Sequence, residues 1–122
     1  MHTNESAENY LETILMLSKV RPVVRSVDIA EELGYKKSSI SVAMKNLREK
    51  EHITVTKEGF IYLTDSGKAI AEMIFERHEL LTKWLMSLGV DEAIASEDAC
   101  KIEHVLSSES FEAIKKYAES IK

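Results

Sequence analysis

The chain has 122 residues and a net charge of −5, with 44% hydrophobic, 7% aromatic and 30% charged residues. This length suits one compact unit or two small subdomains that share a core, and the apolar fraction excludes a disordered chain. One proline and four glycines argue against a turn-rich all-β fold, and no apolar run reaches the roughly 18 residues that a membrane span requires.

The chain opens with apolar side chains at helical spacing. This spacing predicts a first helix over residues 5–19, which Pro22 ends. Ser26 is expected to cap a short second helix over residues 27–33, and Gly34 is expected to terminate that helix.

A third helix and a hairpin come next. Apolar residues on one face predict a helix over residues 38–51. The β-prone segments 53–56 and 60–63 bracket Lys57-Glu58-Gly59, and this pattern predicts a small hairpin. Two helices joined by a tight turn and followed by a hairpin indicate a winged helix-turn-helix.

The rest of the chain predicts three more helices. Thr64 is expected to cap a long helix that Gly89 stops. Two further helices are predicted over residues 91–106 and 108–121. The predicted fold class is therefore mainly α with a small β-hairpin wing.

Charge separates the two halves of the chain. Residues 19–68 contain ten Lys and Arg against seven Asp and Glu, a net charge of +3, whereas the remainder has six against fourteen, a net charge of −8. We expect a winged helix-turn-helix domain over residues 1–68 and a helical domain over residues 69–122, with the first helix, 5–19, contributing to both. A basic half joined to an acidic half indicates two functions, and a chance unevenness of solvated charge is the alternative.

The basic half has the side chains of a DNA-binding surface. In a helix-turn-helix the second helix enters the major groove with its N-terminal residues leading. Lysines and hydroxyls there can bond phosphates, Val42 can contact a thymine methyl, and Ser39 or Ser41 can reach a base edge. Lys57 at the hairpin tip suits a neighbouring phosphate or the minor groove. The predicted contacts to double-stranded DNA are Lys36, Lys37, Ser38, Ser39, Ser41, Val42, Lys45 and Lys57.

Two other interpretations of the basic half stay open. The same residues can form a capped helix beside a solvated run of charge. Winged helices also occur as modules that bind only proteins. The local excess of positive charge favours DNA as the partner.

The acidic half holds residue types that bind metal ions. Cys100, Glu103 and His104 are spaced i, i+3 and i+4, which places a thiol, a carboxylate and an imidazole on one side of a helix. His78 lies on the apolar stripe of its predicted helix, and the first helix adds two oxygen donors. Such a mixed set is typical of transition-metal sites rather than calcium or magnesium sites. The candidate ligands are Asn9, Glu12, His78, Cys100, Glu103 and His104.

Each candidate ligand also has a structural explanation. His78 can be a hydrogen-bonded core histidine, Cys100 a small buried hydrophobic residue, and Glu103 with His104 an exposed pair. A small metalloenzyme is a further alternative. It is disfavoured because no separate catalytic base, phosphate-binding glycine loop or substrate cleft is evident.

The segment Asp98–Ser107, with the sequence DACKIEHVLS, resembles the metal-site helix of the iron-dependent repressors of the diphtheria toxin repressor family. Three further segments are similar to that family's own versions: 8–12, 28–33 and 77–81. The resemblance covers nearly the whole chain. It implies a homodimeric, metal-activated transcription factor with a winged-helix domain and a helical dimerisation and metal-binding domain. The length is similar to that of the two-domain manganese transport regulators, without the SH3-like domain of longer members.

The resemblance also implies a ligand set. Its most specific part gives Cys100, Glu103 and His104 as primary ligands. His78 and Glu12 are implied to complete one or two adjacent sites.

This sequence departs from both branches of the family. Asn9 stands where iron members have methionine and manganese members have aspartate, and Cys100 stands where manganese members have glutamate. Thr82 and Ser96 stand where iron members have further ligands, so a second site of the iron type is not expected. Because a thiolate is a charged, soft donor, we expect Fe(II) as the activating ion and Mn(II) as the alternative.

Together these features predict a metal-dependent repressor of metal-uptake genes, and not an enzyme, that binds a pseudo-palindromic DNA operator as a homodimer. Apolar residues beyond the needs of a small core predict the dimer interface: Trp84, Leu85, Leu88 and Ile94. No membrane and no small organic substrate are expected as partners. The sole cysteine and the lack of a secretory signal indicate the cytoplasm. A metal-independent winged-helix regulator or a protein-interaction module is the alternative.

Overall fold

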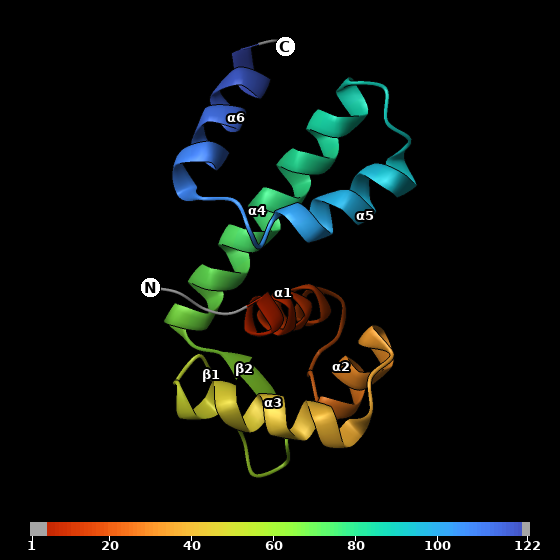
Figure 1. The fold of residues 1–122 in the computed structure, drawn as a ribbon. Coiled ribbons are helices and arrows are strands. Elements are labelled where there is room, and N and C mark those ends of the chain that lie inside the picture. Colours follow the sequence, from red (N-terminus) through yellow and green to blue (C-terminus); the bar gives the residue numbers. More distant parts are fainter. Residues whose placement is uncertain (1–4, 121–122) are drawn as a thin grey trace. The chain divides into compact units, whose positions relative to one another are not determined.

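The structure is a computed structural model that describes residues 5–120 (Figure 1). Over this range it has six helices and one two-stranded sheet, which confirms the predicted mainly α fold with a hairpin wing. The chain divides into two compact units, Met1–Glu72 and Met73–Lys122, and the boundary falls inside helix α4, Asp65–Ser87. The predicted functional domains, 1–68 and 69–122, stay a prediction. Within the described range, every helix is too short or too polar to cross a membrane.

The first unit begins with three helices around one core. Helix α1 spans Glu5–Val20, α2 spans Ser26–Leu33 and α3 spans Lys37–Glu49. The helix-turn-helix pair is therefore α2 and α3, as the sequence predicts. The side chains that fill the core most deeply are Leu11, Ile14, Val24, Ile29, Ile40 and Ile53.

The start of α2 differs from the prediction. Ser26 is the first helical residue and not the cap, and Arg25 occupies the cap position with an extended backbone. The amide of Arg25 donates to Oδ2 of Asp28 at 2.9 Å, and the amide of Asp28 donates back to the carbonyl of Arg25 at 3.0 Å. A carboxylate from inside the first turn thus satisfies the helix start, which makes a serine cap unnecessary.

The turn between α2 and α3 confirms the role of Gly34. This glycine has a left-handed backbone with φ of 71°. Its amide and that of Tyr35 both donate to the carbonyl of Ala30, at 2.9 and 3.1 Å. A left-handed residue directly after a helix is favourable for glycine, which has no Cβ to clash.

The predicted hairpin is also confirmed. Strand β1, Ile53–Val55, pairs antiparallel with β2, Ile61–Leu63, with Thr54 opposite Tyr62. At the tip, the Phe60 amide donates to the hydroxyl of Thr56 at 3.0 Å. The Ile61 amide donates to the carbonyl of Val24 at 2.8 Å, so the chain between α1 and α2 holds the wing against the helices.

Helix α4 starts as predicted. The Thr64 hydroxyl accepts a hydrogen bond from the amide of Gly67 at 3.2 Å, which is an N-cap contact. Gly67 lies so close to the backbone carbonyl of His52 that a side chain there would collide with it. This close approach fixes the start of α4 to the end of the helix-turn-helix.

The second unit contains the rest of α4 and two shorter helices. Helix α5 spans Glu92–Ile102 and α6 spans Ser108–Ser120, so Ile121 of the predicted last helix lies outside the described residues. Gly89 has a φ of 98° and ends α4, as expected. The core residues of this unit are Ile74, Leu81, Ala95, Ala99 and Phe111.

The predicted helix 91–106 is wrong at its C-terminal end. Helix α5 stops at Ile102, and a turn carries the chain to α6. In this turn the carbonyls of Glu103 and Leu106 accept hydrogen bonds from the side chain of Arg77, on α4. The side chain of Arg77 therefore supplies hydrogen bonds that backbone amides would supply if the helix continued.

Candidate metal centre and nucleic-acid interface

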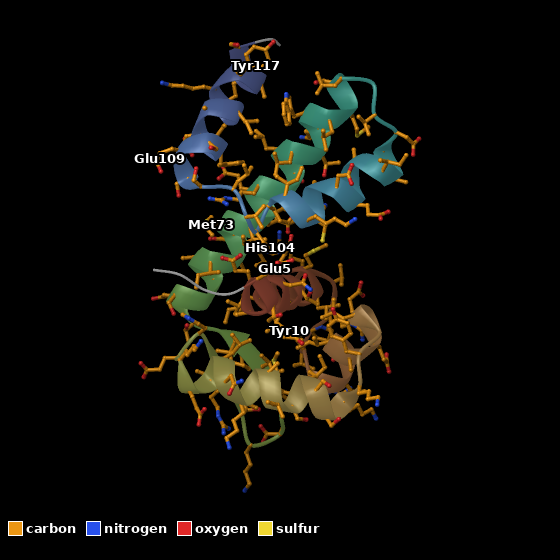
Figure 2. The ribbon with its side chains drawn as sticks, viewed as in Figure 1. Glu5, Tyr10, Met73, His104, Glu109 and Tyr117 are labelled. Atoms are coloured by element: carbon orange, nitrogen blue, oxygen red, sulfur yellow. The ribbon has the colours of Figure 1, made fainter. Side chains whose placement is uncertain are left out.

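Three side chains converge within the second unit. His78 comes from α4, whereas Glu103 and His104 come from the turn after α5 (His104 is labelled in Figure 2). Nδ1 of His78 lies 2.8 Å from Oε1 of Glu103, and Nε2 of His104 lies 3.5 Å from Oε2 of the same carboxylate. The exposed fraction is 0% for the Glu103 side chain, 3% for His104 and 26% for His78. Half of the predicted ligands thus lie together, two histidines on one buried carboxylate.

The spacing of these donor atoms fits a divalent transition-metal ion. Two ligand atoms at about 2.0–2.2 Å from an ion lie about 2.8–3.1 Å apart at a right angle and about 3.3–3.6 Å apart at a tetrahedral angle. His78 Nδ1 lies 2.8 Å from Oε1 and His104 Nε2 lies 3.5 Å from Oε2, so each histidine separately has this spacing to a different oxygen of Glu103. Imidazole nitrogens and carboxylate oxygens are the donors that manganese, iron and zinc share.

His78 is less buried than its place on an apolar stripe predicts. Its side chain is 26% exposed, and both ring nitrogens have polar neighbours. Nδ1 faces Glu103, and Nε2 lies 3.4 Å from the hydroxyl of Ser96. On the same helix, the hydroxyl of Thr82 donates to the carbonyl of His78 at 2.7 Å. The sequence did not predict that the hydroxyls of Thr82 and Ser96 contact His78, although it identified both residues as departures from the iron members.

A cavity of about 570 Å³ lies beside His78, between α4 and α5. Its lining is mostly polar or charged, with only two apolar residues. The lining residues are His78, Glu79, Thr82, Lys83, Met86, Glu92, Ala93 and Ser96. The exposed edge of the imidazole therefore faces space that solvent can enter.

Cys100 differs most from the expected arrangement. The sequence places it with Glu103 and His104 on one side of a helix, but α5 ends at Ile102, before the other two residues. Cys100 is exposed, whereas the Glu103 side chain is fully buried. The coordination of a metal ion by Cys100 stays a prediction.

The two candidate ligands of α1 belong to the first unit. Glu12 is buried, with 7% exposure, and Asn9 is half-buried. The backbone carbonyl of Asn9 accepts a hydrogen bond from the Thr13 hydroxyl at 2.8 Å, which leaves the Asn9 side-chain amide outside this contact. Their participation in a metal site stays a prediction.

The predicted DNA contacts are exposed residues at α3 and at the tip of the wing in the first unit. Helix α3 is held by Ile40, Met44 and Leu47, which are buried on its inner face. Val42, outside this inner face, is 61% exposed and is therefore accessible to a partner. The whole predicted set is exposed: Lys36, Lys37, Ser38, Ser39, Ser41, Val42, Lys45 and Lys57.

A small groove extends this surface toward the wing. It has a volume of about 220 Å³ and lies between the start of α2, α3 and strand β1. Two cationic side chains, Lys45 and Arg48, line it together with Ser26 and Ser41. Ser26 was not among the predicted contacts, whereas the sequence indicates that Arg48 can follow the DNA backbone together with Lys45. Arg48 lies about one helical turn beyond Lys45, a spacing that the sequence alone provides.

Two models of protein families match the chain, one for each part. The family described as "Iron dependent repressor, N-terminal DNA binding domain" matches residues 2–59. The family described as "Iron dependent repressor, metal binding and dimerisation domain" matches residues 64–122.

Characterised relatives cover most of the chain. It is 38% identical over 112 residues to the HTH-type transcriptional regulator MntR of Bacillus pumilus. This match covers 92% of this chain and 78% of the relative. The identity to MntR of Bacillus subtilis is also 38% over 112 residues, with 92% of this chain and 79% of that relative covered.

Solved structures share the fold. The manganese regulator SloR is 26% identical, with a TM-score of 0.82 over 98% of this chain and 55% of that one. A manganese-dependent transcriptional repressor in complex with manganese is 27% identical, with a TM-score of 0.85 over 93% of this chain and 52% of that one. The chain thus spans about half the length of these solved structures.

Proposed function

Since the chain belongs to the iron-dependent repressor family of metal-dependent, DNA-binding transcriptional regulators, we propose that it is a homodimeric repressor of metal-uptake genes. The observation that carries this proposal is the cluster of His78, Glu103 and His104 in the part that matches the metal-binding and dimerisation domain. The relatives are transcriptional regulators, so the metalloenzyme alternative is set aside. The cytoplasmic location stays a prediction from the single cysteine.

The proposed ligands form a mixed set. His78, Glu103 and His104 supply two imidazoles and a carboxylate; the 2.8 Å separation of His78 Nδ1 and Glu103 Oε1 supports binding of one ion by this pair, and His104 lies 3.5 Å from the other carboxylate oxygen. Cys100 would add a thiolate from the surface of α5. The resemblance to the family supports two oxygen ligands from α1, those of Asn9 and Glu12.

The proposed switch uses the distribution of these ligands along the chain. A bound divalent ion supplies one positive centre that several side chains share. Asn9 and Glu12 belong to the helix-turn-helix unit, and the other ligands belong to the helical unit. Side chains that bind one ion must stay together, so binding would favour a single arrangement of the two units. In a dimer, one arrangement means one spacing between the two α3 helices, and hence one spacing of DNA half-sites.

The second unit supports association of two copies. Several large apolar side chains are exposed there, and Leu88 and Ile94, which were predicted at the interface, are 62% and 55% exposed. Trp84 and Leu85 are half-buried. A monomer in sedimentation at micromolar concentration would contradict this part of the proposal.

We expect α3 to read the major groove from a pseudo-palindromic operator. The exposed serines and Val42 at the start of α3 support contacts to base edges, and Lys36, Lys37 and Lys45 support contacts to phosphates. Lys57 at the tip of the wing supports a further phosphate or minor-groove contact. A two-fold dimer requires two half-sites of opposite orientation.

We propose Fe(II) as the activating ion, with Mn(II) as the alternative. The manganese regulator SloR and the repressor in complex with manganese, both similar to this chain, support Mn(II). Cys100 supports Fe(II), because thiolate is a softer donor than the carboxylate that manganese members have at this position.

The decisive experiment is operator binding titrated with Mn(II), Fe(II), Co(II) and Zn(II) in the absence of oxygen. We expect no tight binding without metal and tight binding with at least one of these ions. Binding to the operator that stays equally tight with and without metal would overturn the proposal in favour of a metal-independent regulator.

The variant Cys100→Glu tests the choice of ion. If the thiolate sets the preference, this variant should respond better to Mn(II) and worse to Fe(II) than the natural chain, and Cys100→Ala should lose metal-dependent DNA binding. A matched control is Glu97→Gln, since Glu97 is an exposed carboxylate on the same helix, and its Oε1 lies 3.9 Å from Nζ of the exposed Lys101. An unchanged ratio of Mn(II) to Fe(II) response in Cys100→Glu would remove the argument for iron.

A further inference from the structure

One buried cation lies next to the cluster of His78, Glu103 and His104. Arg77, on α4, is 6% exposed. Its Nη1 atom donates to the backbone carbonyl of Glu103 at 3.1 Å and to that of Leu106 at 2.8 Å. The central carbon of its guanidinium lies 5.2 Å from the centre of the Phe111 ring. One side chain thus joins α4, the turn after α5, and α6.

We propose that Arg77 is a positioning residue for the metal centre: it holds the 103–106 turn so that the Glu103 carboxylate and the His104 imidazole are placed before the ion arrives. This inference rests on the proposed metal-binding function and adds a residue that is not itself a ligand. A ligand set that is already in place loses less conformational freedom on binding, and its affinity for the ion is correspondingly higher.

The first argument is that α4 holds Glu103 at both ends. Arg77 bonds its backbone carbonyl, and the next residue, His78, contacts its carboxylate at 2.8 Å. Adjacent residues of a helix point about 100° apart, so they reach different sides of the same partner. With both its backbone and its carboxylate held, Glu103 has little freedom to turn away from the cluster.

The second argument concerns backbone groups that lose their helical partners. The last carbonyls of a helix have no intrahelical donor, and α5 ends one residue before Glu103. Buried carbonyls need a partner, and Arg77 supplies one for two of them in this turn. Without that donor the turn would have to open toward water or extend the helix, and either change moves the Glu103 carboxylate.

The third argument is that arginine is a poor choice for packing alone. Its Nε atom is buried without a hydrogen-bond partner among the described residues. An apolar side chain would fill the same space without burying a charge or an unpaired N–H group. The guanidinium combines donation from Nη1 to two carbonyls with a cation–π contact, in which its central carbon lies over the Phe111 ring.

Two substitutions test the proposal in the full-length chain. Arg77→Met keeps most of the volume and removes the donors, and Arg77→Lys keeps the charge and one donor group. The readout is the dissociation constant of Mn(II), measured from the signal of free Mn(II) in electron paramagnetic resonance, on variants that circular dichroism shows to be folded. We expect affinity about 10–100-fold weaker for Arg77→Met, the usual range for residues behind metal ligands, with partial recovery in Arg77→Lys.

The control is Lys115→Gln. Lys115 is on α6, and its Nζ atom lies 2.9 Å from Oε2 of Glu76, on α4, so the substitution removes another contact between these two helices without touching the turn. We expect its Mn(II) affinity to stay within about twofold of the natural chain. A folded Arg77→Met protein with affinity within that same range would overturn the proposal.

A measurement on the natural chain covers the case in which Arg77→Met does not fold. The amides of Glu103 and Val105 donate to the carbonyls of Ala99 and Ile102, at 2.9 and 3.0 Å. If Arg77 holds the turn, both amides should resist hydrogen exchange in the metal-free protein as well as those of α5 do. Exchange at the rate of an open loop would overturn the inference. Absence of any Mn(II) binding by the natural chain, with the turn protected, would instead count against the proposed function.

Discussion

The two units of the chain place their functional side chains in opposite environments. In the first unit the proposed DNA contacts are exposed, and the core that supports them consists of other residues. In the second unit the proposed ligand Glu103 is itself 0% exposed and belongs to the core. Contacts with DNA can therefore change without changing the fold, whereas each change at the metal cluster also changes packing and buried polar contacts.

The difference also concerns how far apart in sequence the determining residues lie. The exposed surface of α3 depends on one helix and the turn before it. The metal cluster depends on contacts between residues 25 positions apart, His78 and Glu103, and on Arg77, which lies 26 positions before Glu103. A local sequence pattern therefore predicts the exposed surface of α3 well, and predicts the cluster of His78, Glu103 and His104 only in part.

The largest expected effect comes from Glu103→Gln. This change keeps the shape and an oxygen that can accept from His78, but it removes the charge that a divalent ion requires. Because even residues behind the ligands change metal affinity about 10–100-fold, we expect a loss of at least about 100-fold here, with loss of metal-dependent DNA binding. Isothermal titration with Mn(II) and operator binding measure the two effects.

Glu97→Gln again serves as the control, because it removes an exposed carboxylate of α5, the helix that directly precedes Glu103. An equal loss of affinity in the control would mean that overall charge, and not the buried cluster, sets metal binding. The comparison between buried and exposed functional residues would then fail for the second unit.

The next largest effect concerns the fold of the first unit. In Gly67→Ala the new Cβ would collide with the backbone carbonyl of His52, so α4 or the segment before the wing must shift. Strain of this kind lowers the free energy of unfolding by about 1–3 kcal/mol. Urea denaturation should detect this loss, while the exposed neighbour variant Lys68→Ala should stay within about 0.5 kcal/mol of the natural chain. If Gly67→Ala had the same free energy of unfolding as the natural chain, the contact between the start of α4 and His52 would be able to relax without cost.

The sequence predicted the elements whose signals are local. Helical spacing, the left-handed Gly34, the Thr64 cap and the hairpin around Gly59 all act within a few residues, and the structure confirms each of them. The cap at Ser26 was wrong because Asp28 reaches back to the Arg25 amide, a choice between two equally local signals.

The sequence could not predict the end of α5 for a different reason. The spacing of Cys100, Glu103 and His104 is that of a continuous helix, and nothing between residues 98 and 106 contains a stop signal such as glycine or proline. The helix ends because Arg77 binds the carbonyls of the turn from another helix. The ligand types were therefore predictable from spacing and family resemblance, whereas the burial of Glu103 and the exposure of Cys100 required the three-dimensional structure.

A smaller effect tests the exposed surface of the first unit. Lys37→Ala and Lys45→Ala should each weaken binding to all DNA sequences and flatten the dependence of log K on log salt by about one unit, because each removes one phosphate contact. The matched control on the same helix is Val42→Ala, which should alter base preference and leave the slope unchanged. Lysine variants with the natural slope would contradict the proposed docking of α3.

The smallest effect concerns an exposed ion pair of the second unit. The hydrogen bond and charge of Glu76 raise the pKa of Lys115 above its ordinary value of 10.5. A raised pKa in the folded state means that the pair stabilises the fold at pH values below 10.5, and that this contribution is lost as the pH rises through the raised value. Because the Glu76 carboxylate of the pair is 52% exposed, salt should screen the contribution.

Glu76→Gln should therefore lower the pKa of Lys115, as measured by nuclear magnetic resonance of its side chain, and should make unfolding less sensitive to pH above 10.5. The control Glu112→Gln removes a carboxylate that also raises this pKa, but by charge alone and less strongly, so its effect should be smaller. Neither variant should change Mn(II) affinity, because the pair lies outside the cluster of His78, Glu103 and His104. A change in affinity with either one would mean that exposed charges of the second unit act on its buried site, and the contrast between exposed and buried functional residues would no longer hold within that unit.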